Sequence, residues 1–180
     1  MSNVICKGIL NGRAYGGIGC LINTKKHANK VKFVAKDDRY LALTFYDNLV
    51  VNIYLPVNKD PNSYNCNVID MLTRIGNLIK SHTKHNIVIG VDFNFDFAFN
   101  HPGCILFKEF MRDYKLKCCD ALIDSIDSNM FTYCHASLNS HSFIDHFFGR
   151  LCFLLCVVNC SIDDSGSNLS DHSAVLLKLK

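Results

Sequence analysis

Three short groups of polar residues lie where strands are expected to begin or end, and their side chains are of types that do chemistry. The groups are Asp92-Phe93-Asn94, Asp145-His146 and Ser170-Asp171-His172. A buried Asp can hold an imidazole in one tautomer and keep it basic or cationic. Carboxylates beside it can bind a hard cation such as Mg²⁺, and such a cation polarises a phosphoryl oxygen. Carboxylate, amide and imidazole together favour phosphodiester hydrolysis over acyl transfer.

Each group, taken alone, also has a purely structural interpretation. Asp92 and Asn94 follow a wholly apolar run at residues 87–91, and Asp and Asn often terminate strands. Ser170-Asp171-His172 has the composition of a polar turn. Asp145 differs, because it lies in the otherwise apolar segment 143–148 and is not expected to be buried without a partner. Two Asp-His pairs together with Asp-Phe-Asn make the chemical interpretation the stronger one.

The elements that must position these groups can be predicted from hydrophobic periodicity. Alternating or wholly apolar runs predict strands, and apolar residues at helical spacing predict two helices. The predicted strands cover residues 18–22, 32–35, 40–45, 49–55, 87–91, 131–134, 142–148, 153–158 and 174–179, and the helices cover 67–80 and 104–114. A polar loop with two prolines is expected at 56–65. Because the strands come in runs, the pattern favours an α+β layered sandwich over a doubly wound sheet.

Composition limits the class of protein. The 180 residues suit one domain, 1–180, and 49% apolar residues are typical of a folded globular chain. The net charge of +3 is compatible with a DNA partner without requiring one. We find no secretion signal, so we expect an intracellular protein, cytoplasmic or nuclear. The longest apolar run, 151–158, is too short to span a membrane and is expected to be a buried strand or short core segment.

Zinc was weighed as an alternative because the chain has ten Cys and eight His. No Cys-x-x-Cys pair occurs, and zinc modules usually present paired ligands in tight turns. Without an export signal the cysteines are expected to be reduced thiols. We therefore interpret them as small buried hydrophobic residues.

The order of the motifs resembles the endonuclease/exonuclease/phosphatase superfamily, and within it the apurinic-type endonuclease domain of LINE-type (non-LTR) retrotransposons. Five blocks carry the resemblance across nearly the whole chain. They are Gly-Arg-Ala-Tyr-Gly-Gly-Ile-Gly at 12–19, Val-Asn-Ile-Tyr-Leu-Pro at 51–56, Ile-Gly-Val-Asp-Phe-Asn at 89–94, Ser-Phe-Ile-Asp-His at 142–146 and Leu-Ser-Asp-His-Ser at 169–173. The resemblance implies a DNase I-like fold, a four-layer αββα sandwich.

The resemblance also implies roles for individual residues. Tyr54 would contact the scissile phosphate, and Asp92 would activate the attacking water or assist the leaving group. Asn94 would hold the phosphate and the Asp92 side chain. Asp145 would pair with His172, which would donate to a phosphoryl oxygen. The remaining implied residues are Asp171 at a Mg²⁺ (or Mn²⁺) site and Thr132, Ser170, Arg13 and Asn11 as supporting or substrate contacts, with His146 given a structural role.

One departure from the family pattern concerns the metal. The family's domain begins with a strand bearing an Asn, a helix, and a strand ending in a metal-binding Glu. Here no Glu precedes Val91, and Glu109 is the only Glu in the chain. We therefore expect a sandwich whose first strands and helix are missing, with one metal ligand fewer.

Three functions follow as hypotheses. The first is a Mg²⁺-dependent endonuclease that nicks DNA, and the second is a non-catalytic remnant or nucleic-acid-binding module. The third is a phosphoinositide or sphingomyelin phosphodiesterase of the same superfamily, which the Gly-Arg block at 12–19 fits poorly. A basic stretch at 25–32 suits either phosphate contacts or a solvated loop. No membrane contact is expected, and no protein partner can be inferred.

Overall fold

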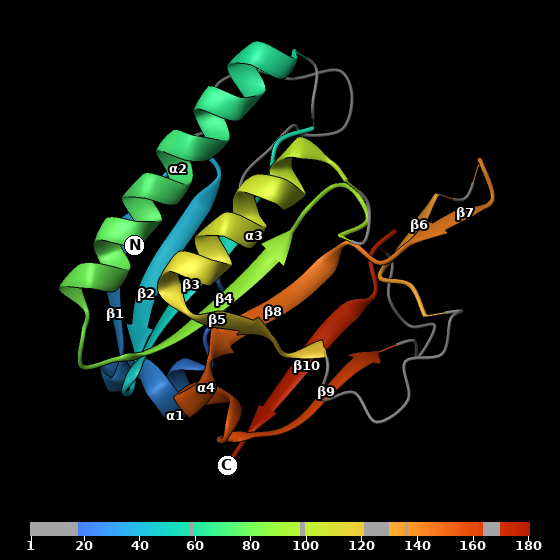
Figure 1. Ribbon diagram of the computed structural model, residues 1–180. Coiled ribbons are helices and arrows are strands. Elements are labelled where there is room, and N and C mark those ends of the chain that lie inside the picture. The colour runs from blue at the N-terminus through green and yellow to red at the C-terminus, as the bar shows by residue number, and fades with distance from the viewer. Residues whose placement is uncertain (1–17, 58–59, 98–99, 121–129, 136, 164–169) are drawn as a thin grey trace, which may run out of the picture.

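Two long helices lie on one face of a six-stranded sheet, and a pair of strands lies on the other face (Figure 1). The structure is a computed structural model of the 180-residue chain. It describes residues 18–57, 60–97, 100–120, 130–135, 137–163 and 170–180. The mixture of helices with a largely antiparallel sheet agrees with the predicted α+β class.

The six-stranded sheet is antiparallel except at its centre, where β3 and β4 run parallel. Its strands in spatial order are β1 (Val31–Lys36), β2 (Tyr40–Phe45), β3 (Asn48–Tyr54), β4 (Asn86–Asp92), β8 (Asp145–Arg150) and β5 (Leu116–Cys118). Parallel strands need a crossover connection, and here it is α2 (Pro61–Ser81), which lies with α3 (Pro102–Tyr114) over one face. β4 therefore ends at the centre of the sheet, where its last residues have neighbours on both sides.

The core lies between the helices and the sheet. Alternate residues of β3 and β4 point toward the helices and are almost fully buried, as period-2 alternation requires. They pack with the apolar stripe of α2 and with Phe107 and Phe110 of α3. The sheet residues of this cluster include Leu49, Val51, Ile53, Ile87, Ile89 and Val91. This packing makes the central strands a rigid support for the polar residues at their ends.

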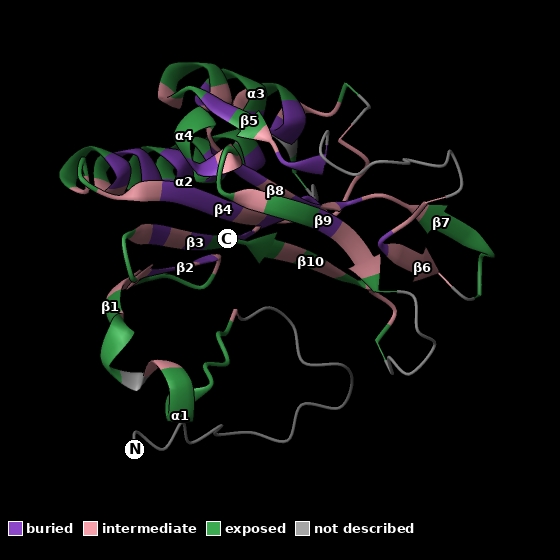
Figure 2. Ribbon diagram, turned by 90° about the horizontal axis from the view of Figure 1, so that it is seen from below, coloured by how far each residue is buried: buried purple, intermediate pink, exposed green. Residues whose placement is uncertain are grey.

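The opposite face of the sheet is covered over a smaller area. β9 (Val157–Asp163) and β10 (Ala174–Leu179) form an antiparallel pair that lies beside β8 and β4 (Figure 2). The cluster between the layers centres on Val88, Cys119 and Phe153. Leu176 of β10 is 50% exposed and Phe33 of β1 is 63% exposed. Among the described residues, this second layer buries far less apolar surface than the helical one.

The remaining described elements are short. They are α1 (Thr24–His27), the 3₁₀ helix η1 (Ala28–Lys30), α4 (Leu151–Leu154), and the paired strands β6 (Tyr133–His135) and β7 (Ser140–Ser142). No described helix is long and apolar enough to cross a membrane.

Four predictions of secondary structure are wrong. The strand predicted at 142–148 is divided between β7 and β8, which belong to different sheets. Residues 18–22 are exposed or half-buried coil rather than a strand, because the described chain gives them no strand to pair with. α2 begins at Pro61, well before the predicted residue 67, because Asp60 accepts a hydrogen bond from the Ser63 amide and Pro suits the first helical position. Residues 151–154 form a helical turn at a corner of the sheet. There only Phe153 is buried, and Leu151 is 67% exposed.

Candidate active site

The ends of three neighbouring strands bring Tyr54, Asp92 and Asp145 into one row. Tyr54 of β3 is the register partner of Asp92 in β4, and Asp92 is the register partner of Asp145 in β8. Residues in register across neighbouring strands present their side chains on the same face. All three side chains are half-buried, and the sheet continues beneath them as a buried apolar core.

A histidine from outside the main sheet completes this group. The Nδ1 atom of His172 lies 2.9 Å from an Oδ atom of Asp145. The His172 backbone is fixed against β6, because the Ser173 amide donates to the Thr132 carbonyl and the Cys134 amide donates to the Asp171 carbonyl. The Asp145–His172 pairing implied by the resemblance is thus present in the geometry, between segments 27 residues apart in the chain.

Asn94 supports the site in a different way from the one predicted. Its backbone is in the left-handed region, with φ of 58°, which Asn tolerates better than most residues. This turn directs the Asn94 amide N–H at a carboxylate oxygen of Asp92, 2.8 Å away. The Asn94 side-chain amide instead donates to the carbonyl of Leu55. Asn94 therefore holds Asp92 through its main chain, and its side chain ties the end of β4 to the end of β3.

The carboxylates and the imidazole perturb one another. Burial, followed by the negative charge of Asp145, raises the pKa of Asp92 from 3.8 to about 6, although the Asn94 amide and His172 act in the opposite direction. The hydrogen bond that the His172 ring donates to Asp145 raises the pKa of His172, against an opposing effect of burial. Asp171 contributes to both shifts, so its charge also acts on this group. Perturbed groups in mutual contact are typical of functional sites.

The residues present fit a hard divalent cation. Single ligand atoms of Asp92, Asp145 and His172 all lie within 4.8 Å of one another. Mg²⁺ prefers oxygen ligands and is usually held by one or two carboxylates together with waters and substrate phosphates. Burial and the negative charge of Asp145 raise the pKa of Asp92. A bound cation would offset the negative charge of these two carboxylates. The predicted metal residue, Asp171, is not in this three-residue group.

The other predicted site residues that the structure describes lie outside the group of Asp92, Asp145 and His172. Thr132 is fully buried, and its hydroxyl accepts the amide hydrogens of Ile144 and Asp145 at 2.9 and 3.0 Å. That hydroxyl cannot contact a substrate, so the substrate-binding part of the Thr132 prediction is wrong and a supporting role remains. Exposed Ser170 accepts a hydrogen bond from the His172 amide. Arg13 and Asn11 lie outside the described residues.

Two features near the site were not predicted from the sequence. The guanidinium of Arg39 lies 4.9 Å from the centre of the Tyr54 ring, which adds a positive charge beside the row of polar residues. Arg39 lies in the hairpin before β2, and only its place two residues after Asp37 in a turn was visible in the sequence. Tyr133 packs against the His172 ring at 5.0 Å between ring centres.

Exposed Glu109 lies on α3, in the groove between α2 and α3, away from these residues.

No family model and no curated protein match this sequence. Among solved structures, the chain is similar to the 3′-5′ exonuclease NExo from Neisseria meningitidis, with a TM-score of 0.62 and 17% identity over 83% of this chain and 70% of that one. A structure of the 3′ phosphatase NExo from Neisseria bound to a product DNA hairpin gives a TM-score of 0.63 and 16% identity, over 84% and 71% of the two chains. The endonuclease domain of TRAS1, a telomere-specific non-LTR retrotransposon, gives 0.63 and 14%, over 83% and 68%.

The chain has a DNase I-like fold. The three structures match more than four-fifths of this chain, which establishes the arrangement of the sheet and helices although the sequence identity is low. It confirms the predicted superfamily fold and its similarity to retrotransposon endonuclease domains. The DNase I-like fold places β4, β8 and the segment before β10 together, which is why motifs widely spaced in the sequence meet in one site.

Proposed function

We propose that this chain hydrolyses phosphodiester bonds in DNA with the help of a divalent cation, and that it nicks the duplex as an endonuclease. The observation that carries the proposal is the Asp145–His172 hydrogen bond of 2.9 Å beside a half-buried Asp92 of raised pKa. The similarity of the fold to nucleases, one of them solved with a DNA hairpin, supports DNA as the substrate class.

Each residue of the site has a separate role in the proposed hydrolysis. His172, which Asp145 keeps protonated to higher pH, donates a hydrogen bond to a non-bridging phosphoryl oxygen and so stabilises the charge that develops there. Asp92, fixed by the Asn94 amide, accepts a proton from the attacking water in its ionised form. Tyr54 stands in the same row and orients the phosphate, with Arg39 adding positive charge beside it. Asp171 adds negative charge near Asp92 and His172.

Asp92 and Asp145 supply the oxygen ligands for the cation in this proposal. Bound there, Mg²⁺ or Mn²⁺ would supply a Lewis acid that polarises the phosphoryl oxygen. Because no Glu belongs to this ligand group, the cation has few charged ligands and we expect weak binding.

Nicking of supercoiled plasmid by the purified chain tests the proposal. The reactions contain Mg²⁺, Mn²⁺ or EDTA, and the variants are His172→Gln and Asp92→Asn. Loss of one charge-stabilising donor costs ~10²–10³-fold in rate, so His172→Gln should fall by at least that factor, and loss of the general base in Asp92→Asn should cost ~10²–10⁴-fold. His82→Gln is a matched control, because His82 lies just beyond the end of α2 and makes only local hydrogen bonds.

The alternative is a module that binds nucleic acid without cleaving it. A parallel assay with an oligonucleotide bearing a 3′ phosphate separates nicking from a 3′ phosphatase activity like that named for NExo. A folded chain that binds duplex DNA but neither nicks plasmid nor releases phosphate with either cation would replace our proposal with the binding module.

A further inference from the structure

β8 presents consecutive residues to opposite faces of the sheet, and each face carries an Asp–His pair. Asp145 points to the candidate active site, where it holds His172. His146, the next residue, points to the helical face, as strand alternation requires. There its ring packs among Phe93, Phe97 and Phe148. The second pair is therefore separate from the site already described.

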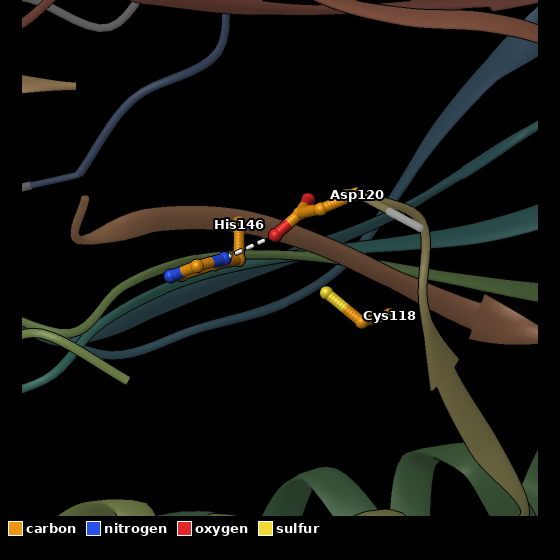
Figure 3. Close-up of side chains that lie close together, drawn as sticks. All are labelled: Cys118, Asp120 and His146. Atoms are coloured by element: carbon orange, nitrogen blue, oxygen red, sulfur yellow. Dashed lines mark hydrogen bonds and ion pairs between the residues drawn. The ribbon is translucent and has the colours of Figure 1, made fainter. Parts of the chain in front are cut away.

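His146 converges with two residues from the end of β5. Its Nδ1 atom contacts a carboxylate oxygen of Asp120, and Cys118 brings a thiol to the same point (Figure 3). One ligand atom from each of the three residues lies within 4.8 Å of the others. Cys118 is the last residue of β5 and Asp120 follows a bend at Cys119, which brings both side chains to His146.

The cluster contains a polar atom whose bonding is incomplete. The Asp120 side chain is 9% exposed, and within the described part of the chain its Oδ1 atom has no hydrogen-bond partner. Buried carboxylate oxygens are normally hydrogen-bonded or coordinate a metal. One Asp120 oxygen contacts the imidazole and the other has no described partner, so a bound cation would offset charge that the contacts of this buried carboxylate leave uncompensated.

The His146 ring can serve as a metal ligand through Nδ1, the atom that faces the Asp120 carboxylate. In the metal-free chain that carboxylate accepts a hydrogen from Nδ1, and a metal would take the place of this hydrogen. The Nε2 atom lies 3.3 Å from the carbonyl oxygen of Phe143, which can accept the hydrogen of a ring bound through Nδ1. Metal-binding histidines almost always donate their other N–H to a carbonyl or carboxylate in this way.

We propose that Cys118, Asp120 and His146 bind a Zn²⁺ ion. Thiolate, imidazole and carboxylate form a donor set that suits Zn²⁺, whereas Mg²⁺ prefers oxygen alone. Ligand atoms of a tetrahedral zinc site lie roughly 3.5 Å apart, so the contacting His146 nitrogen and Asp120 oxygen would move apart to admit the ion, and the sulfur, within 4.8 Å of both, would need to move by little more than roughly 1 Å. Three protein ligands leave the fourth position for water, and Cys118, the only partly exposed member, leaves a side open to solvent.

Metal binding would also change the state of the thiol. Zinc binds cysteine as the thiolate, so a bound Zn²⁺ would release the thiol proton and balance the charges of the thiolate and of Asp120. This role revises the sequence-based interpretation of Cys118 as a small hydrophobic residue.

The test measures metal on the full chain purified under reducing conditions. Zinc per chain is determined by mass spectrometry, and affinity is determined by competition with a chelator. Replacement by Co²⁺ should give thiolate-to-cobalt charge-transfer absorption, which Mg²⁺-site binding cannot produce. The variants are Cys118→Ser and Asp120→Asn, and Cys66→Ser, an exposed cysteine of α2, is the matched control. Circular dichroism checks that each variant folds.

We expect one Zn²⁺ per chain. Cys118→Ser should weaken binding by more than the roughly 10- to 100-fold that loss of an outer partner costs and should abolish the charge-transfer band. Cys66→Ser and Asp92→Asn should retain both. Asp92→Asn thus separates this ion from the proposed catalytic cation. A folded chain that binds no Zn²⁺, or that binds it equally well in Cys118→Ser and Asp120→Asn, overturns the proposal.

Discussion

The charged form of Asp92 lowers the free energy of unfolding, and removing its charge should raise it. Its pKa is raised from 3.8 to about 6, so the folded chain binds the proton more tightly than the unfolded chain. Its contribution to the free energy of unfolding is therefore largest below about pH 4 and declines as the pH rises to about 6. Asn in this position keeps an oxygen for the Asn94 amide but carries no charge.

We expect Asp92→Asn to stabilise the metal-free chain above about pH 7 by ~1–3 kcal/mol relative to its effect near pH 4, because about two pKa units are lost from a partly exposed group. Urea unfolding in EDTA at the two pH values measures this difference, while nicking activity falls. Asp113→Asn, at an exposed carboxylate of α3, is the control and should show no such pH dependence. A stability difference that does not change with pH would contradict the assignment of burial and Asp145 as the cause.

Asp145 determines the protonation of His172. The hydrogen bond that the His172 ring donates to Asp145 is the largest cause of the raised pKa of His172, and burial alone would lower this pKa. Asp145→Asn should therefore lower the pKa of His172 relative to the wild-type chain. Activity that needs the protonated ring should then be lost at a lower pH than in the wild-type chain. Titration of the histidine ring signals by NMR measures the shift, with His172→Gln used to assign the resonance. An unchanged pKa would show that another group holds the proton.

The sequence indicated which residues belong to this site better than it indicated which atoms they contact. Asp145 is recognisable because a carboxylate among apolar residues is costly without a partner, whereas Asp92 and His172 are singled out by the order of the motifs that carry the family resemblance. The partner of Asn94 depends on a left-handed turn, which no spacing reveals. The Asp120–His146 contact joins residues 26 positions apart, and nothing in the sequence near Asp120 marks it.

At the scale of elements, Thr132 fixes the start of β8 to the segment before β6. Its hydroxyl accepts two backbone amides, those of Ile144 and Asp145, in a fully buried place. Thr132→Val keeps the shape but leaves both amides without an acceptor, which should lower the free energy of unfolding by ~1–3 kcal/mol. Activity should fall as well, because Asp145 loses its anchor. Urea unfolding and plasmid nicking measure the two effects. Thr132→Ser, which retains the hydroxyl, should remain close to wild type in both, and equal losses in the two variants would point to packing instead.

Strands with a distinct apolar run could be predicted closely, and elements governed by edges or turns could not. β2 and β10 have the predicted bounds, because each is a largely apolar run of six residues, although no residue of β10 is fully buried. β5 spans only Leu116–Cys118 and was not predicted, since three residues give no period. It forms because Lys115 takes the left-handed conformation that ends α3 and turns the chain back along β8.

At the scale of the whole molecule, the two faces of the main sheet differ in how much they stabilise the fold. The helical face carries the large core cluster, whereas the second face rests on Val88, Cys119 and Phe153. His172 and Asp171 precede β10, which belongs to that thinner layer. A ligand that ties the segment before β10 to β4 and β8 should therefore stabilise the whole chain.

This coupling predicts a dependence of stability on the divalent cation. At about ten times its dissociation constant, an ion that binds only the folded chain adds ~1.4 kcal/mol to the free energy of unfolding. We expect Mg²⁺ and Mn²⁺ to raise the unfolding temperature over the same concentrations that support nicking, whereas NaCl of equal ionic strength should not. Asp92→Asn should lose most of this increment while Cys118→Ser keeps it, because only Asp92 belongs to the proposed catalytic site. If Asp92→Asn gains as much as the wild-type chain, the cation binds elsewhere, and the carboxylates at the ends of β4 and β8 act without it.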